Sequence, residues 1–149
     1  MVEKIRAGIK KLPNAEGLSF PSYMTPGSAG MDLCAAVDTN VTMDVGETAL
    51  IPTGLSISLP DGYEAQVRPR SGLALKYGVT VLNAPGTVDA DYRGEIKIIL
   101  INLGQVPFLV RRGERIAQMI VSKVVKVEWD ERESLDHTKR SEGGFGHTG

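Results

Sequence analysis

The sequence is poor in several features, and each shortage excludes a class of protein. Cys34 is the only cysteine among 149 residues, so no intramolecular disulfide can stabilise the chain as in a small secreted domain. No apolar run reaches the roughly 20 residues of a membrane-spanning helix, and no N-terminal stretch resembles a signal peptide. We therefore expect a cytoplasmic protein with no membrane partner.

An excess of charge of one sign is also missing. The 17 Lys and Arg residues nearly balance 18 Asp and Glu residues, for a net charge of −1. Proteins that bind duplexes without sequence preference usually present a basic face, and we expect no nucleic-acid partner. An anionic small ligand would need local cations and backbone amides. A chain of this length, 42% hydrophobic, fits one domain with a buried core.

Helical periodicity is almost absent. Instead, 17 glycines and 8 prolines separate short runs rich in Val, Ile, Leu and Thr, which is typical of strands. The clearest runs are 48–51, 55–59, 64–67, 79–82, 95–100 and 115–127. One helix of one or two turns is expected between Ser71 as N-cap and Gly78 as the left-handed stop. The predicted architecture is all-β, a jelly roll or a sandwich.

Two segments differ from this alternating pattern. Residues 96–103 are almost continuously apolar, which predicts a strand covered on both faces and suits an obligate interface. Residues 134–149 carry only two large apolar side chains and cannot bury enough area to offset their ordering entropy. This tail is either disordered or a flap that orders on a ligand. Arg140 ahead of the Gly-Gly-Phe-Gly run at 143–146 favours a flap beside a domain of residues 1–133.

Polar side chains interrupt two of the apolar strands. Asp32 lies in the run Ala-Gly-Met-Asp-Leu, where an unpaired buried carboxylate would be costly, so we expect a structural partner or a hydrated metal. Gln118 interrupts the run that begins at Arg115, and a buried amide must find hydrogen bonds. We expect Arg115 to form a structural ion pair.

Two further clusters lie between strands. At Arg70, Ser71 and Gly72, a strand leads into the short helix, so backbone amides, a hydroxyl and a guanidinium come together as a phosphate requires. An ordinary capped turn is the alternative. Residues 83–94 lie between apolar strands and are expected to form a hairpin-like unit. Its Asp89 and Asp91 are expected on one side of an extended chain.

Taken in order, these clusters resemble the five motifs of the trimeric dUTPase family. The matching segments are residues 29–33, 70–74, 86–94, 115–119 and 143–146, and the resemblance covers nearly the whole chain. It implies a distorted jelly roll with one short helix, assembled as a homotrimer with shared active sites. It further implies Mg²⁺-dependent hydrolysis of dUTP to dUMP and pyrophosphate, which keeps uracil out of DNA and supplies dUMP for thymidylate synthesis.

The resemblance also implies a role for each matching residue. Asp89 corresponds to the general base, which deprotonates the water that attacks the α-phosphorus. Mg²⁺ would be chelated by the triphosphate, with Asp32 and Gln118 in its outer sphere, through water. The remaining residues match positions that hold the phosphates, the base, the deoxyribose or the closed tail: Arg70, Ser71, Gly72, Asn83, Gly86, Thr87, Val88, Tyr92, Lys97, Gln118, Arg140, Phe145 and Gly146.

Within this set, base and sugar selection are assigned to residues 83–97. The amide of Asn83 and main-chain groups at Thr87, Val88 and Lys97 would read uracil, and mismatched buried polar groups would reject cytosine. Tyr92 would pack on the deoxyribose and exclude a 2′-hydroxyl. Phe145 would cover the base when the tail closes.

The tail departs from the family pattern at three positions. Ser141, Glu142 and His147 stand where the family has Gly, Ser and Ser. Glu142 brings a negative charge near the triphosphate, which would weaken closure unless the side chain turns outward. None of these departures affects Asp89.

Three other interpretations remain open from sequence alone. A dCTP deaminase shares the fold but uses a glutamate near the base and lacks the Gly-Gly-Phe-Gly tail. A protein of this fold could serve as a regulatory binding partner, although the intact Asp89, Tyr92 and Arg140 argue against a purely non-enzymatic role. An all-β structural or carbohydrate-binding module would leave the five polar clusters unexplained.

Overall fold

The computed structural model describes residues 1–148, and short strands make up most of its regular structure. Its only α-helix within these residues is α1 (Ser71–Tyr77), accompanied by one 3₁₀ turn, η1 (Pro13–Ala15). The strands are β1 (Gly8–Lys11), β2 (Gly30–Cys34), β3 (Val41–Met43), β4 (Thr48–Pro52), β5 (Leu55–Ser58), β6 (Tyr63–Arg68), β7 (Val79–Val81), β8 (Gly86–Val88), β9 (Lys97–Asn102), β10 (Phe108–Val110) and β11 (Arg115–Lys123). The predicted all-β class with one short helix is confirmed.

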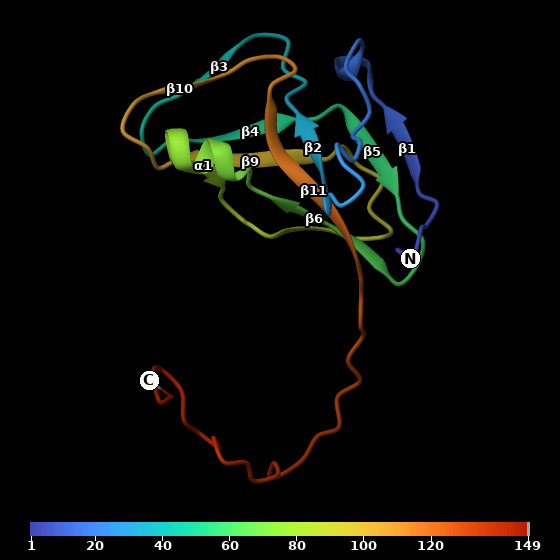
Figure 1. The fold of residues 1–149 in the computed structure, drawn as a ribbon, viewed down its shortest axis with the longest axis vertical. Coiled ribbons are helices and arrows are strands. Elements are labelled where there is room, and N and C mark those ends of the chain that lie inside the picture. Colours follow the sequence, from blue (N-terminus) through green and yellow to red (C-terminus); the bar gives the residue numbers. More distant parts are fainter. Residues whose placement is uncertain (149) are drawn as a thin grey trace.

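The strands form several antiparallel sheets (Figure 1). The largest has the order β2-β11-β6-β8, and a second has the order β4-β9-β7. Two smaller pairs, β1-β5 and β3-β10, complete the fold. Antiparallel pairing across distant parts of the chain places strands from both termini side by side, as β2 and β11 are.

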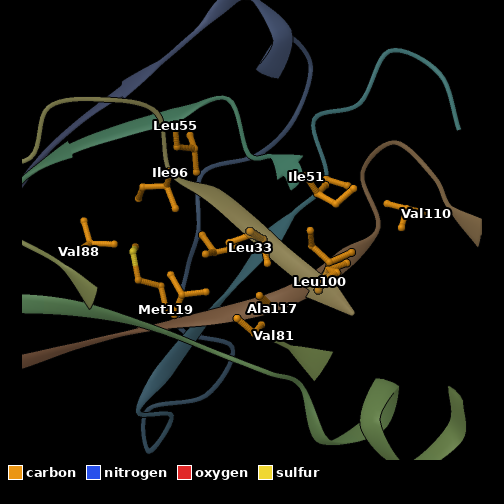
Figure 2. Close-up of a cluster of buried hydrophobic side chains, with 14 of the residues drawn as sticks. Leu33, Ile51, Leu55, Val81, Val88, Ile96, Leu100, Val110, Ala117 and Met119 are labelled. Atoms are coloured by element: carbon orange, nitrogen blue, oxygen red, sulfur yellow. The ribbon is translucent and has the colours of Figure 1, made fainter. Parts of the chain in front are cut away.

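One hydrophobic core joins these sheets. Leu33 of β2, Leu100 of β9 and Ala117 of β11 are fully buried, and Figure 2 shows their side chains gathered in the same cluster. The cluster also takes in Val88 of β8. The larger sheet and β9 therefore pack on the same core. This close-packed core holds the polar side chains at the strand ends in fixed positions.

The helix begins one residue earlier than its sequence suggested. Arg70, not Ser71, is the N-cap residue, with extended backbone angles and no side-chain capping hydrogen bond. The predicted stop is confirmed, because Gly78 adopts a left-handed conformation (φ 66°) and its amide donates to Ala74 O. A Cβ at Gly78 would also lie 2.6 Å from the Gly104 Cα, so a larger residue has no space there.

Two strand predictions need correction. β11 ends at Lys123, four residues before the predicted limit of 127. The β9 strand is not covered on both faces: Ile98 and Leu100 are buried, whereas Ile99 and Ile101 are only half-buried. Leu50, the cross-strand partner of Ile99, is 59% exposed. In a single chain, one apolar side of this strand therefore lacks a full cover.

Beyond Val124, whose amide donates to Gly62 O, the chain leaves the strands and extends away from them (Figure 1). Residues 125–148, which include the described part of the tail, are mostly exposed, and Trp129 and Phe145 are almost wholly so. Among residues 1–148 there is no helix long and apolar enough to cross a membrane.

Candidate functional site

Three polar side chains form a row across the larger sheet. Gln118 of β11 pairs with Asp32 of β2 on one side and with Arg68 of β6 on the other. Directly opposed residues of antiparallel strands project to the same face. The row lies in an open hollow that is lined by Met24, Ser28, Ala29, Gly30, Asp32, Arg68, Gln118 and Ile120.

Asp32 is held by two arginines. Its carboxylate lies 3.1 Å from Arg70 Nε and 3.5 Å from Arg115 Nη1. Arg70 Nη1 also donates to Arg115 O at 3.0 Å, which fixes the turn before α1 against β11. Of the two alternatives for Asp32, the structure gives it structural partners, and the ion pair expected of Arg115 is present. Two cations around one carboxylate leave this cluster locally positive.

Cys34 lies two residues further along β2 and is half-buried. Burial raises the pKa of its thiol, and the nearby Arg115 guanidinium opposes this rise. The thiol is therefore protonated at neutral pH, and we assign it no part in the site.

Gln118 satisfies its amide through the turn that leads to α1. Its Nε2 donates to Pro69 O at 3.0 Å. Its Oε1 points toward Gly30, where a Cβ would lie only 2.6 Å away. The Gln118 side chain thus packs close to Gly30, a contact that sequence analysis did not identify because the two residues are far apart in the sequence.

The start of α1 leaves backbone donors unpaired within the helix. The first amides of any α-helix have no intrahelical acceptor, and no side chain caps them here. Ser71 and Gly72 are exposed at this turn. The turn therefore presents amide donors and a hydroxyl next to the Arg70 guanidinium.

The second group of predicted residues lies in the connection between β7 and β9, which pair antiparallel as expected for a hairpin-like unit. This connection also contributes β8 to the larger sheet, where Thr87 opposes Gln66. Asn83 is exposed, and its Nδ2 is 3.3 Å from the position of a Cβ at Gly86. Val88 is buried, and Lys97 is exposed at the start of β9.

Asp89 and Asp91 lie in a turn, so the predicted extended conformation is wrong. Tyr92 N donates to Asp89 O at 3.1 Å and closes a turn over residues 89–92. Arg93 stabilises this turn by donating from Nη1 to Ala90 O at 2.6 Å. The Asp89 carboxylate is left exposed at the beginning of the turn.

Tyr92 is fixed by residues that sequence analysis did not select. Its hydroxyl donates to Glu95 O at 2.8 Å. The Glu95 carboxylate accepts from Asn14 Nδ2 at 3.0 Å and from Gly54 N at 2.9 Å. These partners lie 81 and 41 residues away in the sequence, and no local pattern marks them.

The predicted residues form separate groups in one chain. Among residues 1–148, no side-chain hydrogen bond or ion pair joins the Asp32 cluster (Asp32, Arg70, Arg115 and Gln118) to residues 83–97. The tail contacts neither group: Arg140 Nε donates to Gly143 O within the tail itself, and Phe145 is fully exposed. The described residues also contain no group of three His, Cys, Asp or Glu side chains that could hold a metal directly.

Known proteins match this chain over almost its full length. The dUTPase family model matches residues 17–149. A Rickettsia felis protein named deoxyuridine 5′-triphosphate nucleotidohydrolase is 60% identical over 141 residues, which is 95% of each chain. A Caldanaerobacter subterraneus subsp. tengcongensis protein of the same name is 58% identical over 141 residues, again 95% of each chain.

Solved structures have the same fold at lower identity. A mutant dUTPase of Staphylococcus bacteriophage 80alpha, solved with dUpNHpp, has a TM-score of 0.86 at 23% identity and covers 98% of this chain and 99% of its own. A mutant dUTPase of phage phi11 of S. aureus, described with a structural Mg(II) ion, has a TM-score of 0.78 at 20% identity and covers 88% and 99%. With the fold, the five motifs and the extent of these matches in agreement, this chain belongs to the dUTPase family.

Proposed function

We propose that this chain hydrolyses dUTP to dUMP and pyrophosphate. The observation that carries the proposal is its identity, over nearly the full length, to two proteins named deoxyuridine 5′-triphosphate nucleotidohydrolase. The arrangement of polar residues agrees with this activity, since one group offers cations and amide donors and another offers an amide, a carboxylate and a phenol. The reaction is that of a dUTP diphosphatase.

Asp89 acts as the general base in this proposal. Asp89 presents an exposed carboxylate at the start of a turn that the Tyr92 amide and Arg93 stabilise. It removes a proton from a water molecule whose oxygen attacks the α-phosphorus. A new P–O bond forms as the bond from the α-phosphorus to the bridging oxygen breaks, and pyrophosphate leaves.

The phosphates bind at the turn before α1. Arg70 supplies a guanidinium, and Ser71 and Gly72 supply a hydroxyl and uncapped amides. Such groups neutralise and position a triphosphate, which is most of what phosphoryl transfer requires. Arg140 adds a second cation from the tail, and Phe145 and Gly146 cover the base when the tail closes.

Mg²⁺ would arrive chelated by the substrate and would be held by Asp32 and Gln118 through water only, because Arg70 and Arg115 already neutralise the Asp32 carboxylate. When bound, Mg²⁺ neutralises triphosphate charge and usually keeps several waters. The Asp32 carboxylate and the Gln118 Oε1 are acceptors for such waters, because Gln118 uses only its Nε2 toward Pro69. No directly coordinating cluster among the described residues is needed for this outer-sphere role.

Residues 83–97 select the nucleoside. Asn83 and the main-chain groups of Gly86, Thr87, Val88 and Lys97 form the uracil pocket, and Tyr92 packs against the deoxyribose. Asn83 is exposed beside Gly86, where its amide can reach a ligand. The Tyr92 ring, which a hydrogen bond to its own loop holds in place, excludes a sugar that carries a 2′-hydroxyl.

The site is completed in a homotrimer. Three observations support this assembly. The residues proposed to bind the nucleoside and those proposed to bind the phosphates are not joined within one chain, and the tail contacts neither set. The sheet of β4, β9 and β7 has an incompletely covered apolar face around Leu50 and Ile99.

We assign residues 1–133 to the catalytic domain and residues 134–149 to a flap that closes over a bound nucleotide.

The cellular role follows from the reaction. Removing dUTP keeps uracil out of DNA, and the dUMP formed is the substrate for thymidylate synthesis. A single cysteine, which can form no intramolecular disulfide, supports a cytoplasmic location for this role.

Pyrophosphate release in the presence of Mg²⁺, compared across dUTP, dTTP, dCTP and UTP, tests the function. We expect dUTP to be strongly preferred, because a site built around the polar groups of one base can reject others by up to about 10⁴-fold. Equal rates for the four nucleotides would disprove selection by residues 83–97. Ammonia release from dCTP would indicate a deaminase instead.

A further inference from the structure

The ring of Tyr92 is supported on one side by its own loop. Its hydroxyl donates to Glu95 O at 2.8 Å. A Cβ built at Gly94 would fall no farther than 2.9 Å from three atoms of the Tyr92 side chain, Oη, Cζ and Cε1. The ring therefore lies directly on the Gly94 backbone, while Tyr92 as a whole remains 45% exposed. One side of the ring is supported and another is open to a ligand.

Glu95 connects this support to the body of the protein. A single carboxylate oxygen, Oε2, accepts from Asn14 Nδ2 at 3.0 Å and from Gly54 N at 2.9 Å. No cation pairs with Glu95 in the described part of the chain. The carboxylate thus serves to gather two N–H donors from separate segments, one from η1 and one from the turn between β4 and β5.

Those two segments are themselves fixed. Arg112 donates from Nη1 to Asn14 O at 2.8 Å and from Nη2 to Glu16 O at 2.7 Å, which fixes η1 in place. Gly54 has a φ of 66°, and a Cβ there would meet the Ala15 backbone N at 2.9 Å. Glu95 is therefore anchored at two points that cannot shift independently.

The residue after Glu95 is anchored as well. Thr53 Oγ1 donates to Ile96 O at 2.5 Å, and Ile96 N donates to Leu55 O at 2.8 Å. Thr53 and Ile96 are both about 2% exposed. The carbonyl of Glu95, which receives the Tyr92 hydroxyl, thus lies between an anchored side chain and an anchored neighbour.

From this arrangement we propose that Glu95 is a positioning residue for sugar selection, acting through Tyr92, and that Asn14 assists it from η1. The inference rests on the proposed function, in which the Tyr92 ring packs against the deoxyribose. Neither Glu95 nor Asn14 contacts the nucleotide. They set the place of the ring, so the space left for a 2′-hydroxyl depends on a hydrogen-bond chain that begins 81 residues earlier in the sequence.

The test compares kcat/KM for dUTP with kcat/KM for UTP in the full-length protein. For Glu95→Ala we expect the ratio of the two to fall on the order of tenfold, less than the roughly 10²-fold that a misplacement of about 1 Å can cost. Glu95→Gln should restore most of the ratio, because an amide oxygen can accept from both N–H donors. Asn14→Ala should lower the ratio by a smaller factor, since the Gly54 amide remains.

The matched control is Glu47→Ala. Glu47 also accepts a backbone amide in a turn, from Asp44 N at 2.8 Å, but it lies between β3 and β4 and not in the Tyr92 chain. The ratio of kcat/KM for dUTP to kcat/KM for UTP in this variant should match that of the unmodified protein. Melting temperature and oligomeric mass of every variant show whether a change in ratio accompanies a general loss of structure.

If folded Glu95→Ala retains the full preference for dUTP, the inference is wrong, while the proposed function stands on the unmodified protein. Failure of Glu95→Gln to restore the ratio would equally overturn it. If Glu95→Ala does not fold, Asn14→Ala and Gly94→Ala decide the matter: a lowered ratio in both supports the inference, and an unchanged ratio in either contradicts it. An unmodified protein that does not prefer dUTP would disprove the proposed function itself.

Discussion

Asp89 stands at a point where the chain turns sharply but the side chain remains open to solvent. Its main-chain carbonyl accepts the Tyr92 amide, whereas no hydrogen bond or ion pair to its carboxylate is present in residues 1–148. The backbone of the turn is thus fixed by groups other than the carboxylate. Changing that side chain should leave the turn intact, so chemistry and structure can be separated at this residue.

Asp89→Asn should abolish most turnover and leave binding largely unchanged. The amide has nearly the same shape but cannot accept a proton from water, and general bases typically contribute 10²- to 10⁴-fold. We expect kcat for dUTP to fall by about 10²-fold or more. Calorimetry with a non-hydrolysable dUTP analogue should give an affinity close to that of the unmodified protein. Turnover that survives the substitution would show that another group is the base.

Whether the contacts of a single residue can be predicted depends on how far away its partner lies in the sequence. An aspartate in an apolar strand had to have a partner, but only the structure shows that Arg70 and Arg115 provide it. The motifs marked Tyr92, whereas its support by Glu95 and Asn14 depends on contacts between distant segments. Patterns in a single sequence therefore identify chemically important residues well, but they predict poorly which residues lie close together in the fold.

Among the elements, the tail is the one that does not pack on its own chain. Its internal hydrogen bonds, such as Gly143 N to Arg140 O at 2.9 Å, form local turns only. Phe145 is fully exposed, and so contributes no burial to the stability of the single chain. An element with few buried contacts opens at little cost in free energy, which suits a segment that closes only over a ligand.

Deleting residues 140–149 should therefore lower activity far more than stability. We expect kcat/KM for dUTP to fall at least tenfold, while the melting temperature changes by less than about 2 °C, which for a chain of this size corresponds to no more than about 1 kcal/mol. Arg140→Ala in the full-length chain separates loss of the cation from loss of the cover. A large drop in melting temperature on deletion would contradict a flap that is free in the absence of nucleotide.

Strand positions followed from composition more closely than strand limits did. The run at 55–59 became β5 over Leu55–Ser58, because its alternation matches a sheet with one buried face. The apolar run to 127 was too long for β11, since its last residues have no partner strand in the same chain. The helix start was misplaced by one residue because Arg70 occupies the cap position without capping.

On the scale of the whole molecule, the single chain leaves one face of the sheet of β4, β9 and β7 incompletely covered. Its inner face supplies buried residues such as Ile98 and Leu100, whereas on the outer face Leu50 and Ile99 form an apolar cross-strand pair that remains partly exposed. This pair is the place where the proposed homotrimer would supply a cover. The sequence predicted that the β9 strand is apolar on both sides. It could not show whether the residues that cover the outer side come from the same chain.

Leu50→Glu should therefore break the proposed homotrimer without unfolding the chain. The side chain is 59% exposed in the single chain, so a carboxylate there costs little, whereas an unpaired charge buried in an interface costs about 3–5 kcal/mol. Light scattering after size exclusion should show a mass reduced from about three times 16.0 kDa to 16.0 kDa. Val45→Glu, at a site 52% exposed in the turn before β4, is the matched control and should keep the higher mass.

Loss of the proposed trimer should also remove activity, and this result separates a site shared between subunits from a site completed within a single chain. In the shared arrangement, residues 83–97 of one subunit face Arg70 of another, so a monomer retains both half-sites but cannot bring them together. Leu50→Glu monomers with a normal circular dichroism spectrum should show at least 10²-fold lower kcat/KM, a loss consistent with losing the phosphate-binding groups. Active monomers would mean that one chain builds the whole site by itself, since Leu50 belongs to neither group of site residues.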